Sequence, residues 1–248
     1  MLDGRRRQRA ILLLVPAAVV GASLAGCTSS SSHGASASLS ATKANSFSPS
    51  KLRAALLTRV NGVGATSPAA SGDYTAISAQ VAGGQSPGGA PKACAQATRT
   101  GLDSAVLAGA TAAAVTFKVG GNAVSELVAA APGTAAASAL AGRLPASCAR
   151  YKETVDGKTV TYSVTESSLT GIGKQAKVLS VSSAAGGSDA RWSLVYRGAG
   201  FVGAVTVAGP NASQAAVRQL GQQAYAYAAR SLSEIRPVGA GSDRPVGN

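Results

Sequence analysis

Apolar residues recur with a period of two through the middle of the chain. Between residues 113 and 208 they alternate with small or polar residues in six short runs, which is typical of half-buried strands. Glycine-containing turns at residues 120–122 and 198–200 predict that the first two and the last two of these strands form hairpins. The six predicted strands cover residues 113–119, 123–129, 159–166, 176–182, 191–197 and 201–208.

Segments with apolar residues at helical spacing lie before, between and after these predicted strands. Ser48 and Pro49 provide an N-cap and a first-turn proline, and apolar residues follow at helical spacing as far as Val60. Further helices are expected over residues 92–102, over 134–144, and from about 211 to 232. Residues 61–91, rich in Gly, Pro, Ser and Ala, are expected to be loosely structured. Hairpins with inserted helices predict an α+β fold, an antiparallel sheet of about six strands flanked by helices.

Residues 1–26 resemble a bacterial lipoprotein signal peptide. An arginine-rich start precedes an apolar run over residues 10–22, which is too short for a stable membrane span. Residues 24–27, Leu-Ala-Gly-Cys, then match a lipobox, whose cysteine thiol takes a diacylglyceryl group. We therefore expect a lipidated Cys27 at the extracytoplasmic face of the cell membrane. A plain signal peptide with a coincidental cysteine is the alternative, and export by the general secretory or the twin-arginine route stays open.

Composition divides the rest of the chain into three parts. Residues 27–47 are rich in Ser and Ala and too poor in apolar bulk to offset the entropy of ordering, so they are expected to form a flexible tether from the lipid. This tether contains His33, the single histidine of the chain. Residues 48–235 hold the predicted elements and form the expected ectodomain. Residues 236–248 contain Pro and Gly without an apolar pattern and are expected to be a disordered tail.

The chain is basic, with 23 Lys and Arg against 10 Asp and Glu and a formal net charge of +13. The basic residues after the signal segment are scattered and not interleaved with aromatics, so nucleic acid is not an expected partner. The expected partners are the membrane, through the N-terminal lipid, and a small or lipidic ligand or a cell-wall polymer. A solvated basic surface that binds nothing specifically is the alternative.

The chain contains short matches to catalytic and cofactor-binding motifs, but the surrounding sequence argues against each of these functions. One histidine excludes a His-based triad and a multi-His metal site. Residues 84–88 match the letters of a nucleophile elbow, but Gly and Pro surround them and the folded region offers no histidine base. Residues 171–176 loosely match a dinucleotide fingerprint, yet they join two predicted strands and are better explained as a turn. We expect no enzyme activity, no cofactor and no metal.

Two cysteines remain once Cys27 is lipidated. Cys94 and Cys148 form an even pair in an exported protein, and we expect them to oxidise to a disulfide. Such a bridge closes a long loop and stabilises the fold by roughly 4 kcal/mol in the chain-entropy model. A redox-active pair is the alternative, but it calls for a Cys-x-x-Cys arrangement or a polarising partner, and neither is near.

Five features in this order resemble one known family. They are Pro-Lys-Ala-Cys at 91–94, Leu-Pro-Ala-Ser-Cys at 144–148, Leu-Thr-Gly-Ile-Gly at 169–173, the hairpin from Val195 to Val205, and the long final helix. Together they resemble the PknH-like extracellular sensor domain of actinobacterial receptor kinases and lipoproteins. The resemblance implies an antiparallel sheet and helices around an open cleft that binds an extracellular ligand. The chain departs from the family in having one possible disulfide where the kinase sensors typically have two, and no kinase domain or transmembrane helix is expected here.

These observations predict a non-catalytic, lipid-anchored, sensor-like domain that binds a small or lipidic ligand at the cell surface. The alternative is an interaction module whose basic surface binds cell-wall polymers or a membrane partner protein. The sequence assigns no ligand-binding residue. Trp192, Tyr196 and Phe201 alternate along predicted strands, where such side chains more often belong to the core.

Overall fold

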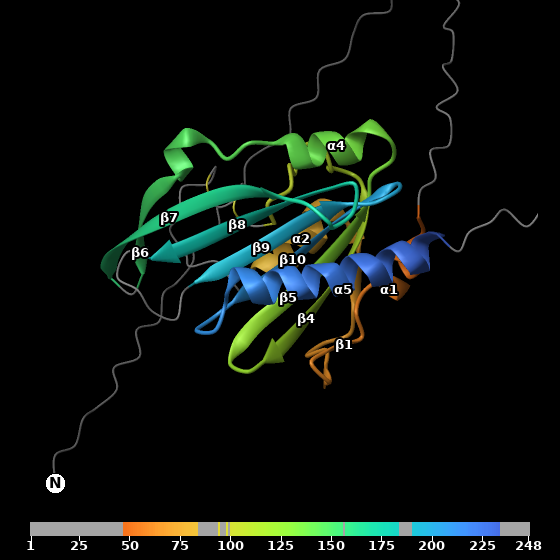
Figure 1. Cartoon of the computed structure of the whole chain (residues 1–248), viewed down its shortest axis with the longest axis horizontal. Helices are drawn as coiled ribbons and strands as arrows, with labels where there is room; N and C mark the ends of the chain where they lie inside the picture. Colours follow the sequence, from red (N-terminus) through yellow and green to blue (C-terminus); the bar gives the residue numbers. More distant parts are fainter. Residues whose placement is uncertain are drawn as a thin grey trace, which may run out of the picture. The chain divides into compact units, whose positions relative to one another are not determined.

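Eight antiparallel strands form one sheet in the computed structural model, which describes residues 47–83, 94, 98, 100–155, 157–183 and 190–233 (Figure 1). The strand order is β3-β4-β5-β10-β9-β8-β7-β6, so consecutive strands are neighbours except where β10 inserts beside β5. The strands are β3 (Ala70–Asp73), β4 (Thr111–Val119), β5 (Asn122–Ala130), β6 (Arg150–Val155), β7 (Lys158–Leu169), β8 (Gln175–Ser183), β9 (Arg191–Arg197) and β10 (Phe201–Ala208). A separate small hairpin pairs β1 (Arg59–Val60) with β2 (Val63–Gly64).

Helices cover both faces of one end of this sheet. Helix α5 (Gln214–Ser233) packs on β9 and β10, and α1 (Pro49–Ala54) packs beside it on β4 and β5 (Figure 1). On the opposite face lie α2 (Tyr74–Gly83) and α4 (Thr134–Ala141), which is followed by the 3₁₀ helix η1 (Ala146–Cys148). The Oγ of Ser48 caps α1 by accepting a hydrogen bond from the Lys51 amide at 3.3 Å, as the sequence predicts.

Because helices lie on both of its faces, the sheet separates two apolar cores. In β10, Val205 and Val207 point toward α1 and α5, whereas Val202 and Ala204 point toward α2 and α4. Every residue of β10 except the last is buried, which is expected of a strand covered on both sides.

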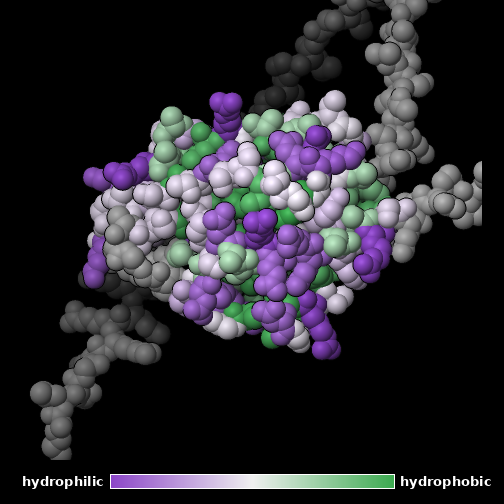
Figure 2. Space-filling view, viewed as in Figure 1, coloured by the Kyte–Doolittle hydropathy of each residue, from purple (hydrophilic) through white to green (hydrophobic). Residues whose placement is uncertain are grey.

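The β6–β8 end of the sheet is built differently. On the α2 and α4 face, a third cluster surrounds the disulfide between Cys94 and Cys148 and includes the stacked rings of Tyr151 and Tyr162, whose centroids are 5.4 Å apart. On the opposite face no described helix covers β6 and β7 (Figure 1), whereas Ala176 and Val178 of β8 are buried in the core beneath α5. Figure 2 shows that face, pale where Ser and Thr dominate and purple where α5 presents its polar side.

The structure confirms the α+β class and the predicted strands. Strands β9 and β10 begin and end at the predicted residues, and the other four lie within three residues of their predicted limits. The sheet is larger than expected because β3 and β6 join its two edges. The final helix is also confirmed, and the Thr134 helix is confirmed but ends at Ala141, before Gly142 and Pro145.

Two predictions near the start of the domain are wrong. Residues 61–91 are not loosely structured as far as they are described, because β2, β3 and α2 lie within them. Helix α2 begins at an Asp73 cap, whose Oδ1 accepts from the Thr75 amide at 2.8 Å, and it buries Tyr74 and Ile77. The first helix ends at Ala54 instead of Val60, because Arg59 and Val60 form strand β1. This strand pairs with β2 across a turn in the left-handed region (Asn61 φ 49°, Gly62 φ 82°).

Several predictions fall on residues that the structure does not describe. These are the signal segment, Cys27, His33, the tail, and the elbow-like letters at 84–88. Of the predicted helix over 92–102, Cys94 and Thr98 are helical and residues 100–102 are not; its remaining residues lie outside the described part of the chain.

Candidate functional site

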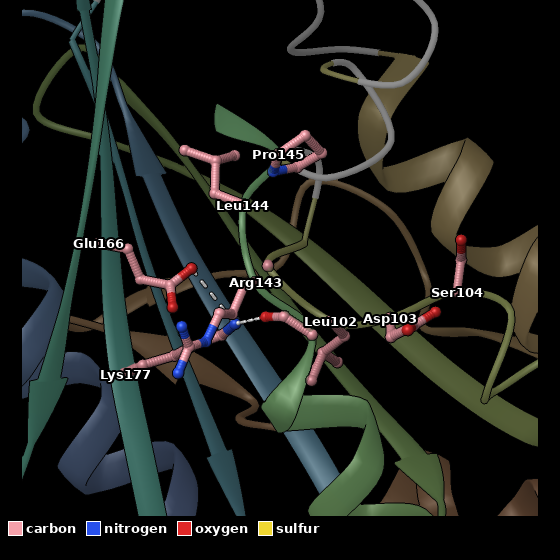
Figure 3. Close-up of a pocket in the computed structure, with 10 residues that line it drawn as sticks. Leu102, Asp103, Ser104, Arg143, Leu144, Pro145, Glu166 and Lys177 are labelled. Carbon is pink, nitrogen blue, oxygen red and sulfur yellow. Dashed lines mark hydrogen bonds and ion pairs between the residues drawn. The ribbon is translucent and has the colours of Figure 1, made fainter. Parts of the chain in front are cut away.

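A cavity of about 230 Å³ lies at the boundary between the helix-covered end of the sheet and the disulfide end (Figure 3). Two loops and the sheet form its walls. One loop comprises residues 101–104, and the other comprises residues 142–145, directly after α4. The sheet contributes Glu166 of β7 and Lys177 of β8, whose side chains point into the space between the loops in Figure 3.

Lys177 is the buried cation of this cavity. Its side chain is 9% exposed, and its Nζ donates a hydrogen bond to the Gly142 carbonyl at 2.7 Å. The same Nζ lies 3.4 Å from Oε2 of Glu166, whose side chain is 28% exposed. An ammonium group has three N–H donors, and these two acceptors use two of them. Because Lys177 lines the cavity, a molecule bound there would lie beside this ammonium group.

The two loops contact one another directly. The Asp103 amide donates to the Ala139 carbonyl of α4 at 2.9 Å, and Oδ1 of Asp103 accepts from the Ala105 amide at 2.9 Å. A Cβ at Gly142 would lie 3.3 Å from Cβ of Asp103, so glycine permits this close approach. Gly101 has φ +73° and faces Leu179 of the sheet, where a Cβ would come within 2.6 Å of a methyl group.

The disulfide joins the chain segments that carry these loops. Cys94 precedes residues 101–104 and Cys148 follows residues 142–145, with a Cα–Cα distance of 5.2 Å across the bridge. Both cysteines are buried, at 3% and 0% exposure. The predicted pairing is therefore confirmed, and the bridge restrains both walls of the cavity.

The lining offers mixed chemistry for a small polar molecule. Lys177 and Arg143 supply cationic donors, Asp103 and Glu166 supply carboxylates, and Ser104 supplies a hydroxyl. The apolar part of the wall consists of Leu102, Leu144 and Pro145. Within the described ranges, no group of three or more His, Cys, Asp or Glu side chains is placed to hold a metal ion.

A second buried ionisable group lies on the other side of the sheet. Glu126 of β5 is 1% exposed, and its Oε2 accepts a hydrogen bond from the Leu57 amide at 2.8 Å. Burial raises the pKa of this carboxyl from 4.5 to about 8, against the opposing effect of the Leu57 bond. Its Oε1 and the hydroxyl of Tyr196 have no hydrogen-bond partner among the described residues. Burial, and then the charge of Glu126, raises the pKa of Tyr196 well above its ordinary value.

The aromatic residues expected in the core are found there. Tyr196 is 0% exposed and Phe201 is 2% exposed, with ring centroids 6.4 Å apart, and Trp192 is half-buried at the edge of the same core. None of the three lines the cavity. Residues 170–174 connect β7 to β8, so the turn interpretation of the dinucleotide-like letters is confirmed.

Sequence reasoning missed Lys177. The signal was present in the predicted strand, because Lys177 alternates with Leu179 and Val181 and so shares their buried face. A lysine on an apolar strand face is costly unless it is paired, which marks the position as unusual.

Comparison of the sequence with protein-family models and with curated proteins found no match. Across the described ranges, no helix is both long enough and apolar enough to cross a membrane.

Proposed function

We propose that this chain is a lipid-anchored, non-catalytic ectodomain that binds a small ligand in the cavity beside Lys177. In this proposal Cys27 carries the lipid, and residues 27–47 connect it to the ectodomain at the extracytoplasmic face of the membrane. The resemblance to PknH-like sensor domains, which rests on sequence features alone, supports a sensing role that reaches the cell through a partner protein.

The buried ammonium of Lys177 is the observation that carries the proposal. Removing a charge from water is unfavourable unless it is paired and hydrogen-bonded, and Lys177 has one carboxylate and one carbonyl partner. A ligand bound in the cavity would lie beside this ammonium group. The cavity is smaller than the roughly 300–1,000 Å³ of most ligand pockets, so the ligand is expected to be small.

The carboxylates of the cavity serve the structure of its walls, which favours binding over catalysis. Asp103 holds its own loop through the Ala105 amide, and Glu166 balances the charge of Lys177.

Native and denaturing mass spectrometry of the full-length protein from its producing cells tests the proposal. We expect an adduct that leaves on denaturation, and a diacylglyceryl mass on the peptide that begins at Cys27. Lys177→Met should lose the adduct, whereas Lys174→Met, which removes an exposed lysine three residues before Lys177, should keep it. A protein without an adduct, or an adduct kept by Lys177→Met, contradicts ligand binding at this cavity.

The interaction-module alternative is favoured by the distribution of charge. Glu126 and Glu153 are buried, so these two carboxylates do not balance the surface cations. Binding to cell-wall polymers or to a partner membrane protein that weakens steeply with salt would support this second function.

A further inference from the structure

A hydroxyl-rich surface lies on the uncovered side of β6 and β7. Along β7 every second residue from Thr159 to Ser167 is Ser or Thr, and these side chains share one face because side chains alternate along a strand. Strand β6 places Arg150 and Lys152 beside them, opposite Ser163 and Thr161. We call this surface the serine/threonine face; it is bordered by the buried hydroxyl of Ser180 of β8.

The composition of the sheet changes where the helix cover ends. Under α5, the same side of the sheet carries Val205 and Val207, which are buried. On β7, Thr159, Thr165 and Ser167 are exposed. The polar character therefore belongs to a surface that meets solvent, since no described helix packs on it.

The serine/threonine face carries cations without carboxylates. The described parts of β6 and β7 contain two acidic residues, Glu153 and Glu166. Both occupy strand positions whose side chains point to the other face of the sheet, where the cavity lies. Arg150 and Lys152 are exposed and share a face with the hydroxyls. Such a surface complements an anionic partner.

An aromatic side chain borders the hydroxyls. Trp192 of β9 is in register with Ser180, which is in register with Thr165, so the three lie in one row across the strands. The hydroxyls of Thr165 and Ser180 are 2.7 Å apart, which fixes their orientation. A hydroxyl both donates and accepts hydrogen bonds, and a half-buried indole offers an apolar ring with a polar N–H.

We propose that the serine/threonine face binds an anionic polysaccharide. The hydroxyls match the hydroxyl groups of a sugar chain, the two cations match its carboxylate or phosphate groups, and Trp192 offers a surface for the apolar side of a sugar ring. The cavity lies on the other side of the sheet, so an extended polymer on this face does not compete with a ligand beside Lys177. The proposal therefore goes beyond the ligand-binding function above and stands independently of it.

The test measures binding of the full-length protein, held in detergent micelles, to polygalacturonate by isothermal titration calorimetry. The Arg150→Gln/Lys152→Gln variant should bind at least about tenfold more weakly, because it removes both charge-assisted contacts. Arg53→Gln/Arg218→Gln makes the same charge change on α1 and α5 and should stay within about twofold of the unmodified protein. Thr161→Val/Thr165→Val keeps β-branched side chains, removes two hydroxyls, and should weaken binding by at least about threefold.

Several outcomes would overturn the proposal. Equal weakening in both charge variants would mean that only overall charge matters, and equal affinity for poly-L-glutamate would mean that sugar hydroxyls are not recognised. Unmeasurable binding to polygalacturonate would also overturn it. If the Arg150→Gln/Lys152→Gln variant instead lost binding to phosphatidylglycerol vesicles and kept binding to polygalacturonate, the surface would be assigned to a lipid partner. Lys177→Met should leave polygalacturonate binding unchanged, so failure of the cavity proposal and failure of this one are distinguishable.

Discussion

The two ends of the sheet hold together by different means. At the β4-β5-β10-β9 end, helices cover both faces, and the burial of apolar side chains supplies most of the stabilisation. At the β7-β6 end, one face is open to solvent and the other is closed by a small cluster around the Cys94–Cys148 disulfide. The comparison indicates that an end with too little apolar cover depends on a covalent bond, and that this same end is where polar side chains face solvent.

Removing the disulfide should have the largest effect on stability. We expect Cys94→Ala/Cys148→Ala to lower the free energy of unfolding by about 4 kcal/mol, measured by urea denaturation. Hydrogen exchange should show amide protection falling most in β6 and β7 and least in β5 and β10, because the bridge restrains only the former end. A uniform loss of protection along the sheet would show that the two ends are not separately stabilised.

The buried carboxyl of Glu126 should make the stability of the covered end depend on pH. Its pKa is about 8 in the folded protein and 4.5 ordinarily, so below pH 4.5 both states hold the proton and the free energy of unfolding is unaffected. Between pH 4.5 and 8 the unfolded state ionises first, and stability falls by as much as about 1.4 kcal/mol per pH unit. Glu126→Gln should remove this loss. Between pH 5 and pH 7 its stability relative to the unmodified protein should therefore rise by about 2–3 kcal/mol. A stability difference that stays constant over this range, in thermal or urea unfolding, would contradict the buried neutral carboxyl.

Packing at the covered end is tight enough for one methyl group to matter. A Cβ at Gly203 of β10 would lie 2.3–2.5 Å from atoms of the Tyr196 ring, which is buried and contacts Phe201 and Tyr225. Gly203→Ala should therefore destabilise by about 2 kcal/mol, measured by urea unfolding. The control is Gly72→Ala in β3, where the new Cβ would meet nothing closer than 3.9 Å and should cost nothing. Similar losses for both variants would point to the glycine backbone itself instead of the Tyr196 contact.

The same contrast explains what the sequence could predict. Strands β9 and β10 alternate clearly, and their limits were predictable from the pattern alone. Strand β6 was not predictable from the pattern of apolar residues. Arg150 and Lys152 occupy its exposed face, and one of the residues on its buried face is the charged Glu153, so apolar residues do not recur at every second position. Helix α2 was hidden by its Ala- and Ser-rich sequence, and its tertiary contacts through Tyr74 and Ile77 decide its structure.

The candidate sites were less predictable than the fold. The disulfide followed from an even pair of cysteines, but the cavity depends on two loops, at 101–104 and 142–145, that the fold brings together from distant parts of the chain. No local pattern encodes that contact, which Gly142 permits by its missing side chain. The Ser and Thr alternation of β7 was visible, but its meaning depends on which face the helices leave open.

The smallest expected effect on stability is at the open end of the sheet. Thr161→Val replaces a half-buried hydroxyl on the uncovered face of β7 by a methyl group without changing the β-branched shape. Because this side chain packs under no helix, the free energy of unfolding should change by less than about 0.5 kcal/mol in urea unfolding. The matched change at the covered end is Thr206→Val in β10, where the hydroxyl is buried and lies 2.9 Å from that of Ser193. That variant leaves a buried polar partner unsatisfied and should cost about 1–3 kcal/mol. If the two substitutions cost the same, the open face is covered by something else, and its hydroxyls are not free to meet a polymer.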